Sequence, residues 1–140
     1  MKNKELISKT NNFLSKILQS IFVCSLFIGS DAVAQDGYEA GKIVFERKCS
    51  GCHEVGSEAV SSVGPILNNL FGRKAGTAAG YKYYSQANLN AQFIWTEDNF
   101  KKYIENPKSM IAATKQIFNG LKDKNEIDNI TEYLKKFSNK

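Results

Sequence analysis

The sequence is poor in the residues that most metal and catalytic sites need. Its 140 residues include one histidine, three cysteines and two methionines. Beyond residue 34 the only cysteine and histidine side chains are Cys49, Cys52 and His53. A structural zinc site takes four such ligands in nearly every case, so it would be one short. If His53 has another task, no second imidazole is left for acid–base chemistry.

Long uniform runs are also missing. Lys and Arg total 19 against 14 Asp and Glu, a formal charge of +5, and the basic residues are spread singly and in pairs. This spread argues against a nucleic-acid-binding arm and indicates a mildly positive, solvated surface. No apolar run reaches the length of about 20 residues that a membrane-spanning helix needs.

Residues 1–34 have the pattern of an export signal. Scattered lysines precede an apolar run at 17–28, and Ala32-Val33-Ala34 is a small-x-small cleavage pattern. The sequence therefore predicts a signal peptide at 1–34, with an uncleaved membrane anchor as the alternative. A single domain is expected at 35–140, because no internal repeat or linker interrupts it.

The most informative stretch is Cys49-Ser50-Gly51-Cys52-His53. In a helical turn, two thiols three residues apart point to one side, where they can attack the two vinyl groups of a haem. The adjacent imidazole can then reach the iron. The pattern indicates a c-type haem attachment site. A thioredoxin-like redox pair is the alternative, but it needs a βαβ surround that the sequence does not show.

Three helices are expected around this stretch. The first runs from Tyr38 to Lys48, with Gly41 permitting close approach of another helix and Ala40, Ile43, Val44 and Phe45 mostly on one face. The second is capped by Thr96 and ends at Asn106-Pro107. The third begins near Asp123, with Glu126 completing a capping box, and carries the apolar stripe Ile127, Ile130, Leu134 and Phe137. It is expected to cross the first helix near Gly41.

The remaining segments lack any helical or strand period. Residues 54–81 and 109–121 read as loops, and 83–89 as a short helical turn. A long loop in a small domain needs something to pack against. A large apolar cofactor would supply it, with Ile66, Leu67, Leu70 and Phe71 packing on the haem.

With these motifs the chain resembles the class I cytochromes c, most closely the mitochondrial and α-proteobacterial branch. The resemblance covers residues 37–140. It rests on the haem attachment stretch followed in order by Gly64-Pro65-x-Leu67, Leu70-Phe71-Gly72-Arg73-Lys74-x-Gly76, Gly80-Tyr81-x-Tyr83-Tyr84, Ala87-Asn88, Trp95, Tyr103-x-x-Asn106-Pro107-Lys108, Thr114-Lys115, Phe118 and Gly120. The fold it implies is all-α, with three main helices and long loops wrapped round one haem c bound through Cys49 and Cys52.

The resemblance also implies roles for individual pocket residues. His53 would bind the iron, with the carbonyl of Pro65 accepting its imidazole N–H. The haem propionates would be held by Arg73, Tyr84 and Trp95, and the polar side of the pocket lined by Asn88, Tyr103 and Thr114. One residue is inserted between Gly80 and Asn88 relative to the family pattern, which makes Tyr83 an alternative to Tyr84.

The sixth iron ligand departs from the family pattern. Where the family has Pro-Gly-Thr-Lys-Met, with the methionine bound to iron, this chain has Ala112-Ala113-Thr114-Lys115-Gln116. The ligand could be the amide oxygen of Gln116, the neutral amine of Lys115, or Met110 after rearrangement of the loop. The position could also stay open or hold water. Each option favours ferric iron more than a family methionine would, except Met110, so the expected potential lies below the family norm.

The implied function is a periplasmic one-electron carrier of a respiratory chain, not an enzyme. By family position Lys48, Lys108, Lys115 and Lys122 ring the exposed haem edge and steer it to acidic docking sites. The expected partners of this monomer are a membrane cytochrome bc-type complex and a haem–copper oxidase, docked peripherally. The rival hypotheses are a haem protein that binds small ligands or turns over peroxide, and a redox-inactive binding module.

Overall fold

The computed structural model of the protein describes residues 31–138. The chain divides into two compact units, residues 1–34 and 35–140, and nearly all described residues belong to the second. The predicted signal peptide therefore lies outside the described residues, except for its last four. No helix within the described part is long and apolar enough to cross a membrane.

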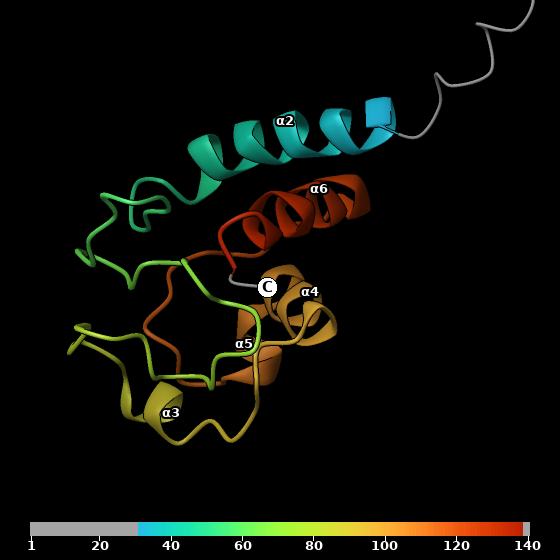
Figure 1. Cartoon of the computed structure of the whole chain (residues 1–140). Coiled ribbons are helices and arrows are strands. Elements are labelled where there is room, and N and C mark those ends of the chain that lie inside the picture. The colour runs from blue at the N-terminus through green and yellow to red at the C-terminus, as the bar shows by residue number, and fades with distance from the viewer. Residues whose placement is uncertain (1–30, 139–140) are drawn as a thin grey trace, which may run out of the picture. The chain divides into compact units, whose positions relative to one another are not determined.

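Helices and loops make up the whole of the described chain. No strand occurs within residues 31–138, and a single isolated bridge pairs Lys74 with Ile94. The all-α fold predicted from the sequence is confirmed. The helices are α2 (Asp31–Lys48), α3 (Gln86–Leu89), α4 (Glu97–Glu105), α5 (Pro107–Met110) and α6 (Lys124–Lys135) (Figure 1).

The two predicted capping residues begin their helices as expected, with one difference in detail. Thr96 accepts a hydrogen bond from the backbone N–H of Asn99 at 3.1 Å and starts α4. Asp123 caps α6, but it accepts from Asn125 at 2.8 Å. The capping box with Glu126 is wrong, because the Asp123 carboxylate bonds the N–H one residue earlier than a capping box requires.

Three further expectations are corrected. Helix α2 begins at Asp31, before the expected Tyr38, and so includes the small residues of the cleavage pattern. Ile43 is 53% exposed and lies off the buried face of α2. Residues 107–110 form a short helix where a loop was expected from Ser109 onward. Pro107 explains it, because the fixed φ of proline suits the first position of a helix even where it ends the preceding one.

The predicted crossing of the first and last helices at Gly41 is confirmed. A Cβ on Gly41 would overlap the backbone carbonyl of Asn129 in α6, so only glycine permits this approach. Beside the crossing, the ring of Tyr133 lies 5.2 Å from that of Tyr38 and 5.4 Å from that of Phe45. Figure 1 shows α2 and α6 side by side along this contact.

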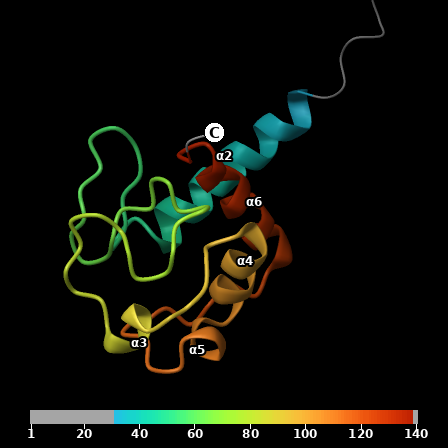
Figure 2. The same ribbon diagram turned by 60° about the horizontal axis from the view of Figure 1, so that its bottom comes forward.

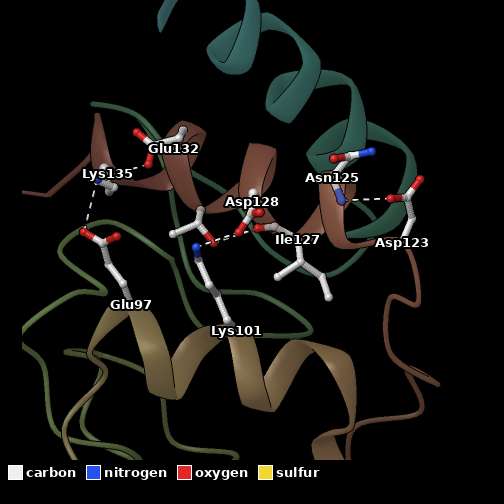
Figure 3. A network of polar contacts seen from close by, with 9 residues as sticks. Glu97, Lys101, Asp123, Asn125, Ile127, Asp128, Glu132 and Lys135 are labelled. Atoms are coloured by element: carbon white, nitrogen blue, oxygen red, sulfur yellow. Dashed lines mark hydrogen bonds and ion pairs between the residues drawn. The ribbon is translucent and has the colours of Figure 1, made fainter.

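Helices α4 and α6 are joined by a buried apolar seam and an exposed row of ion pairs. The seam contains Phe100, Ile104, Ile127 and Ile130, all at most 7% exposed. Above it Lys101 reaches Asp128 at 2.6 Å, and Lys135 reaches both Glu97 and Glu132 at 3.1 Å (Figure 3). Exposed ion pairs of this kind contribute about 0–1 kcal/mol each to the free energy of unfolding. The contact between α4 and α6 therefore depends mainly on the apolar seam.

The long loop lies beside the helices. In Figure 2 the green and yellow segment at residues 50–85 stands to one side of α4 and α6, with α3 at its lower edge. Its apolar residues Leu70 and Ala75 join the same core as the helices. The loop and the helices together therefore frame the interior of the domain.

Candidate haem site

A cavity of about 470 Å³ lies between the long loop and helices α4 and α6. Phe100 and Ile104 of α4 and Ile130 and Leu134 of α6 line its apolar side. All ten residues expected to hold the cofactor line the same cavity: Cys49, Cys52, His53, Pro65, Arg73, Tyr84, Asn88, Trp95, Tyr103 and Thr114. Gln116 and Lys115 line it too, whereas Met110 does not.

The attachment stretch continues the helical pattern of α2. The N–H of Cys49 donates to the carbonyl of Phe45 at 2.8 Å, and the N–H of His53 donates to the carbonyl of Cys49 at 2.9 Å. These four-residue spacings turn Cys49, Cys52 and His53 to the same side, where they line the cavity. Both thiols are free and half-buried.

The environment of Cys49 does not suit a redox thiol. Burial, with a smaller contribution from Cys52, raises the pKa of the Cys49 thiol to about 12. Reactive redox cysteines have lowered pKa values and accessible sulfurs. In the described part of the chain, no three His, Cys, Asp or Glu side chains are placed to hold a metal ion.

The imidazole of His53 has a fixed orientation. Its Nδ1 lies 2.7 Å from the carbonyl oxygen of Pro65, and because a carbonyl only accepts, Nδ1 carries the proton. Burial is the main effect and lowers the pKa of His53. The hydrogen bond to Pro65 raises this pKa by a smaller amount, and the Arg73 charge lowers it again. The ring is therefore neutral at neutral pH and keeps the lone pair of Nε2 for a ligand.

Arg73, which lines the same cavity, has a buried donor without a partner. Its Nη1 donates to the carbonyl of Asn68 at 3.0 Å and its Nη2 to that of Ile66 at 3.2 Å. Its Nε is buried without a partner. Buried donors are normally paired, and a carboxylate at the cavity wall would pair this one. A haem propionate fits that requirement, so the residues present suit the implied cofactor.

Tyr83 and Tyr84 both line the cavity, and Tyr84 is the more buried of the two. It is half-buried and its hydroxyl accepts from the N–H of Ala78 at 3.1 Å, whereas Tyr83 is 73% exposed. Tyr81, which sequence reasoning did not single out, donates to the carbonyl of Val63 at 2.8 Å and joins two distant parts of the loop. Trp95 is buried, with its ring 5.0 Å from that of Tyr103.

The hydroxyl of Thr114 connects the polar side of the cavity. Its oxygen accepts from the side-chain amide of Asn88 at 3.4 Å and from the backbone N–H of Gln116 at 3.2 Å. The hydroxyl of Tyr103 lies 3.5 Å away. Ser85, another residue that sequence reasoning missed, accepts from Asn88 at 3.0 Å. Its position as the cap of α3 was the available signal.

The segment that carries Gln116 is held at both ends. Ile111 is 3% exposed, and its N–H donates to Pro107 at 3.0 Å. Leu121 is also 3% exposed, and its N–H donates to Ile104 at 2.8 Å. Residues 112–119 between them are exposed or half-buried.

Four of the side chains expected beside the haem do not line the cavity: Ile66, Phe71, Lys108 and Lys122. Phe71 does not line the cavity and packs edge-on against Phe100, with ring centroids 5.6 Å apart. Lys122 does not line it either, and donates to the carbonyl of Glu105 at 2.7 Å. Leu67 and Leu70 do line it, as the cofactor-packing hypothesis requires, whereas Ile66 does not.

Comparison with known proteins identifies the family. Residues 38–138 match the family model described as cytochrome c. The chain is 41% identical over 125 residues to cytochrome c2 of Blastochloris viridis, which covers 89% of this chain and 95% of the relative. It is 48% identical over 99 residues to cytochrome c2 of Rhodoplanes tepidamans, covering 71% and 91%. It is 46% identical over 99 residues to cytochrome c-550 of Nitrobacter winogradskyi, covering 71% and 89%.

These matches agree with the geometry of the site. Cys49 and Cys52 stand at the attachment motif of the matched family, beside a cavity of the right composition. The chain therefore belongs to the cytochrome c family, as an electron-transfer protein with one covalently bound haem c and not an enzyme.

Proposed function

We propose that this protein is a periplasmic one-electron carrier whose haem iron would be bound by His53 and Gln116. The single observation that carries the proposal is the composition of the cavity, which Gln116 shares with His53. When bound, the haem supplies reversible one-electron exchange. The chain would hold it and supply its ligands from the residues that line the cavity.

The position of Gln116 supports its choice over the other candidates. Its side chain is half-buried and lines the cavity at the place where the family pattern has methionine. Lys115 also lines the cavity but is exposed, and its amine would have to lose a proton before binding iron. Met110 does not line the cavity, so it would require rearrangement of the segment.

The polar contacts around Thr114 orient the proposed ligand. Thr114 accepts from the backbone N–H of Gln116, which fixes the start of the Gln116 side chain relative to the cavity wall. The amide of Asn88 and the hydroxyl of Tyr103 hold Thr114 in turn. With the backbone held in this way, only the side-chain torsions of Gln116 would need ordering on binding the iron.

The proposed ligation lowers the reduction potential. A thioether stabilises ferrous iron, whereas a harder amide oxygen favours the ferric state comparatively more. For one electron, each factor of ten in this preference corresponds to about 59 mV. The carrier is thus expected to work at a potential below that of methionine-ligated relatives.

The surroundings of the cavity support transient docking. Lys48 and Lys115 line its edge, and the exposed apolar side chains Val63, Tyr83 and Ile117 also border it. Lysines beside exposed apolar side chains would steer the protein to acidic partners for brief encounters. We propose membrane cytochrome bc-type complexes and terminal oxidases as these partners, with residues 1–34 directing export to the periplasm.

The test is an optical titration of the purified haem protein. Ferric and ferrous spectra are recorded at controlled potential, and carbon monoxide is then added to the reduced protein. The proposal predicts a six-coordinate spectrum, a potential below the family norm and slow or absent carbon monoxide binding. A thioether charge-transfer band in the ferric spectrum would overturn Gln116 ligation. Immediate carbon monoxide binding would instead favour the small-ligand or peroxide-handling hypothesis.

A further inference from the structure

Gly64 lies flat against the imidazole of His53. A Cβ on Gly64 would stand 2.7 Å from Nδ1 and 2.9 Å from Nε2 of that ring, and closer still to Cε1. Packed interiors do not absorb such an overlap without movement. We propose that Gly64 is a positioning residue for the iron ligand, because its bare backbone forms the wall that sets where the His53 ring lies. The proposal rests on His53 binding the iron, as proposed above.

The requirement for glycine at position 64 comes from space and not from backbone conformation. The described glycines with positive φ are Gly56, Gly72, Gly76, Gly80 and Gly120. Gly64 is not among them, so its backbone conformation is open to other residues. Gly64 is also buried, so an added methyl group could not turn to solvent.

The backbone around Gly64 is held more firmly than the ring. The N–H of Gly64 donates to the carbonyl of Cys52 at 2.8 Å, which ties the segment to the attachment turn. Two residues on, Ile66 donates to the hydroxyl of Ser61 at 3.1 Å, and Leu67 donates to Glu54 at 3.0 Å. An added Cβ would therefore displace the ring of His53 before it displaced the backbone.

Displacement of the ring would reach the iron through a defined contact. Pro65 holds one edge of the imidazole by the 2.7 Å hydrogen bond at Nδ1, and Gly64 limits the movement of its face. Together these two residues restrict both side-chain rotations of His53. Moving the His53 ring would lengthen its hydrogen bond to the Pro65 carbonyl and change the direction of Nε2 relative to the cavity.

The first experiment compares Gly64→Ala with Gly51→Ala in the haem-loaded protein. Gly51 is a matched control, because it lies in the same attachment region, is exposed, and has no atom within 4 Å of an added Cβ. Gly64→Ala is expected to shift the ferric electron paramagnetic resonance g values and the reduction potential. Gly51→Ala should reproduce both wild-type readings. Wild-type readings for Gly64→Ala would overturn the proposal.

A second experiment remains decisive even if Gly64→Ala fails to fold. In His53→Gly the clash is absent, and free imidazole can fill the vacated space. Imidazole is expected to restore a wild-type-like ferric spectrum, and adding Gly64→Ala should weaken its binding about tenfold or more. Equal imidazole affinity in the two backgrounds would overturn the role of Gly64. An unchanged spectrum in His53→Gly itself would instead overturn His53 as the ligand.

Discussion

The hydroxyl oxygen of Thr114 lies 3.4 Å from the side-chain amide nitrogen of Asn88, a residue 26 positions earlier in the chain. This contact joins α3 to the segment that carries Gln116. Because the same oxygen accepts from the Gln116 backbone at 3.2 Å, one hydroxyl connects two walls of the cavity at the proposed ligand.

Replacing Thr114 should loosen the proposed sixth ligand without removing it. Thr114→Val deletes the shared acceptor while keeping the shape, and one hydrogen bond contributes about 1 kcal/mol. A loss of about 1 kcal/mol corresponds to roughly a fivefold change in the equilibrium between bound and dissociated ligand. Displacement of the sixth ligand by cyanide, followed optically in the ferric protein, should accelerate about fivefold. Thr114→Ser keeps the hydroxyl and serves as the control, and equal rates in all three proteins would contradict the network's role.

Restoring methionine at position 116 should raise the reduction potential. In Gln116→Met a thioether would replace the amide, stabilise ferrous iron and shift the potential upward by more than about 59 mV, a factor of ten. A spectroelectrochemical titration measures the shift, and the thioether band should appear in the ferric spectrum. Met110→Leu is the control and should change neither. If Met110→Leu altered the spectrum and Gln116→Met did not, the ligand would be Met110.

The helix crossing at Gly41 should be sensitive to a single methyl group. Gly41→Ala would press a Cβ into the Asn129 carbonyl and cost about 1–3 kcal/mol of unfolding free energy. Gly37 is the control in the same helix, because its added Cβ would lie 3.8 Å from Asn129 Oδ1, an ordinary contact. Gly37→Ala should be neutral or stabilising, since alanine favours helix. Denaturant unfolding of both variants checks the difference.

The ion pair between Lys101 and Asp128 should give a small pH-dependent stability. The hydrogen bond from Lys101 holds the pKa of Asp128 below its ordinary value of 3.8. The contribution is therefore fully present above pH 3.8 and is lost as the pH falls through the lower, folded-state pKa. Asp128→Asn should be slightly less stable than wild type at pH 7, and the two should converge in acid. A constant difference down to the lowest pH would contradict this.

The lysines expected around the haem edge should differ in whether they affect the rate of electron transfer or the stability of the fold. Lys115 lines the cavity, so Lys115→Gln should slow reduction of an anionic mediator such as ferricyanide and weaken the dependence of its rate on ionic strength. Lys122 instead donates to the last turn of α4 at Glu105. Lys122→Gln should lower stability and leave the rate nearly unchanged. Stopped-flow rates across a salt series test both variants, and equal effects would contradict the separation.

Sequence reasoning worked best where one residue decides a local structure. Thr96 and Asp123 marked the starts of α4 and α6, and Gly41 marked the helix crossing, because a cap or a missing Cβ acts within a few residues. The haem attachment stretch was predicted equally well, because the side chains of Cys49, Cys52 and His53 share one helical turn.

What sequence reasoning missed depends on contacts between distant residues of the loops. Nothing in the local pattern pairs Tyr81 with Val63, or turns Lys122 toward Glu105. The role of Gly64 was hidden for the same reason, because a glycine without positive φ leaves no local sign of the ring it faces. Loop residues acquire their partners only when the whole domain closes round its interior.

Because Ile111 and Leu121 are anchored, side chains in the segment between them can be exchanged without moving its ends. Both ends are buried and bonded to α5 and α4, whereas residue 116 sits in a stretch of exposed or half-buried residues. Under the proposed ligation, a change of side chain there would alter the group offered to the iron while both anchored ends stay in place. Descendants of one ancestral carrier could thus diverge in redox character by single substitutions, with no redesign of the domain that bears them.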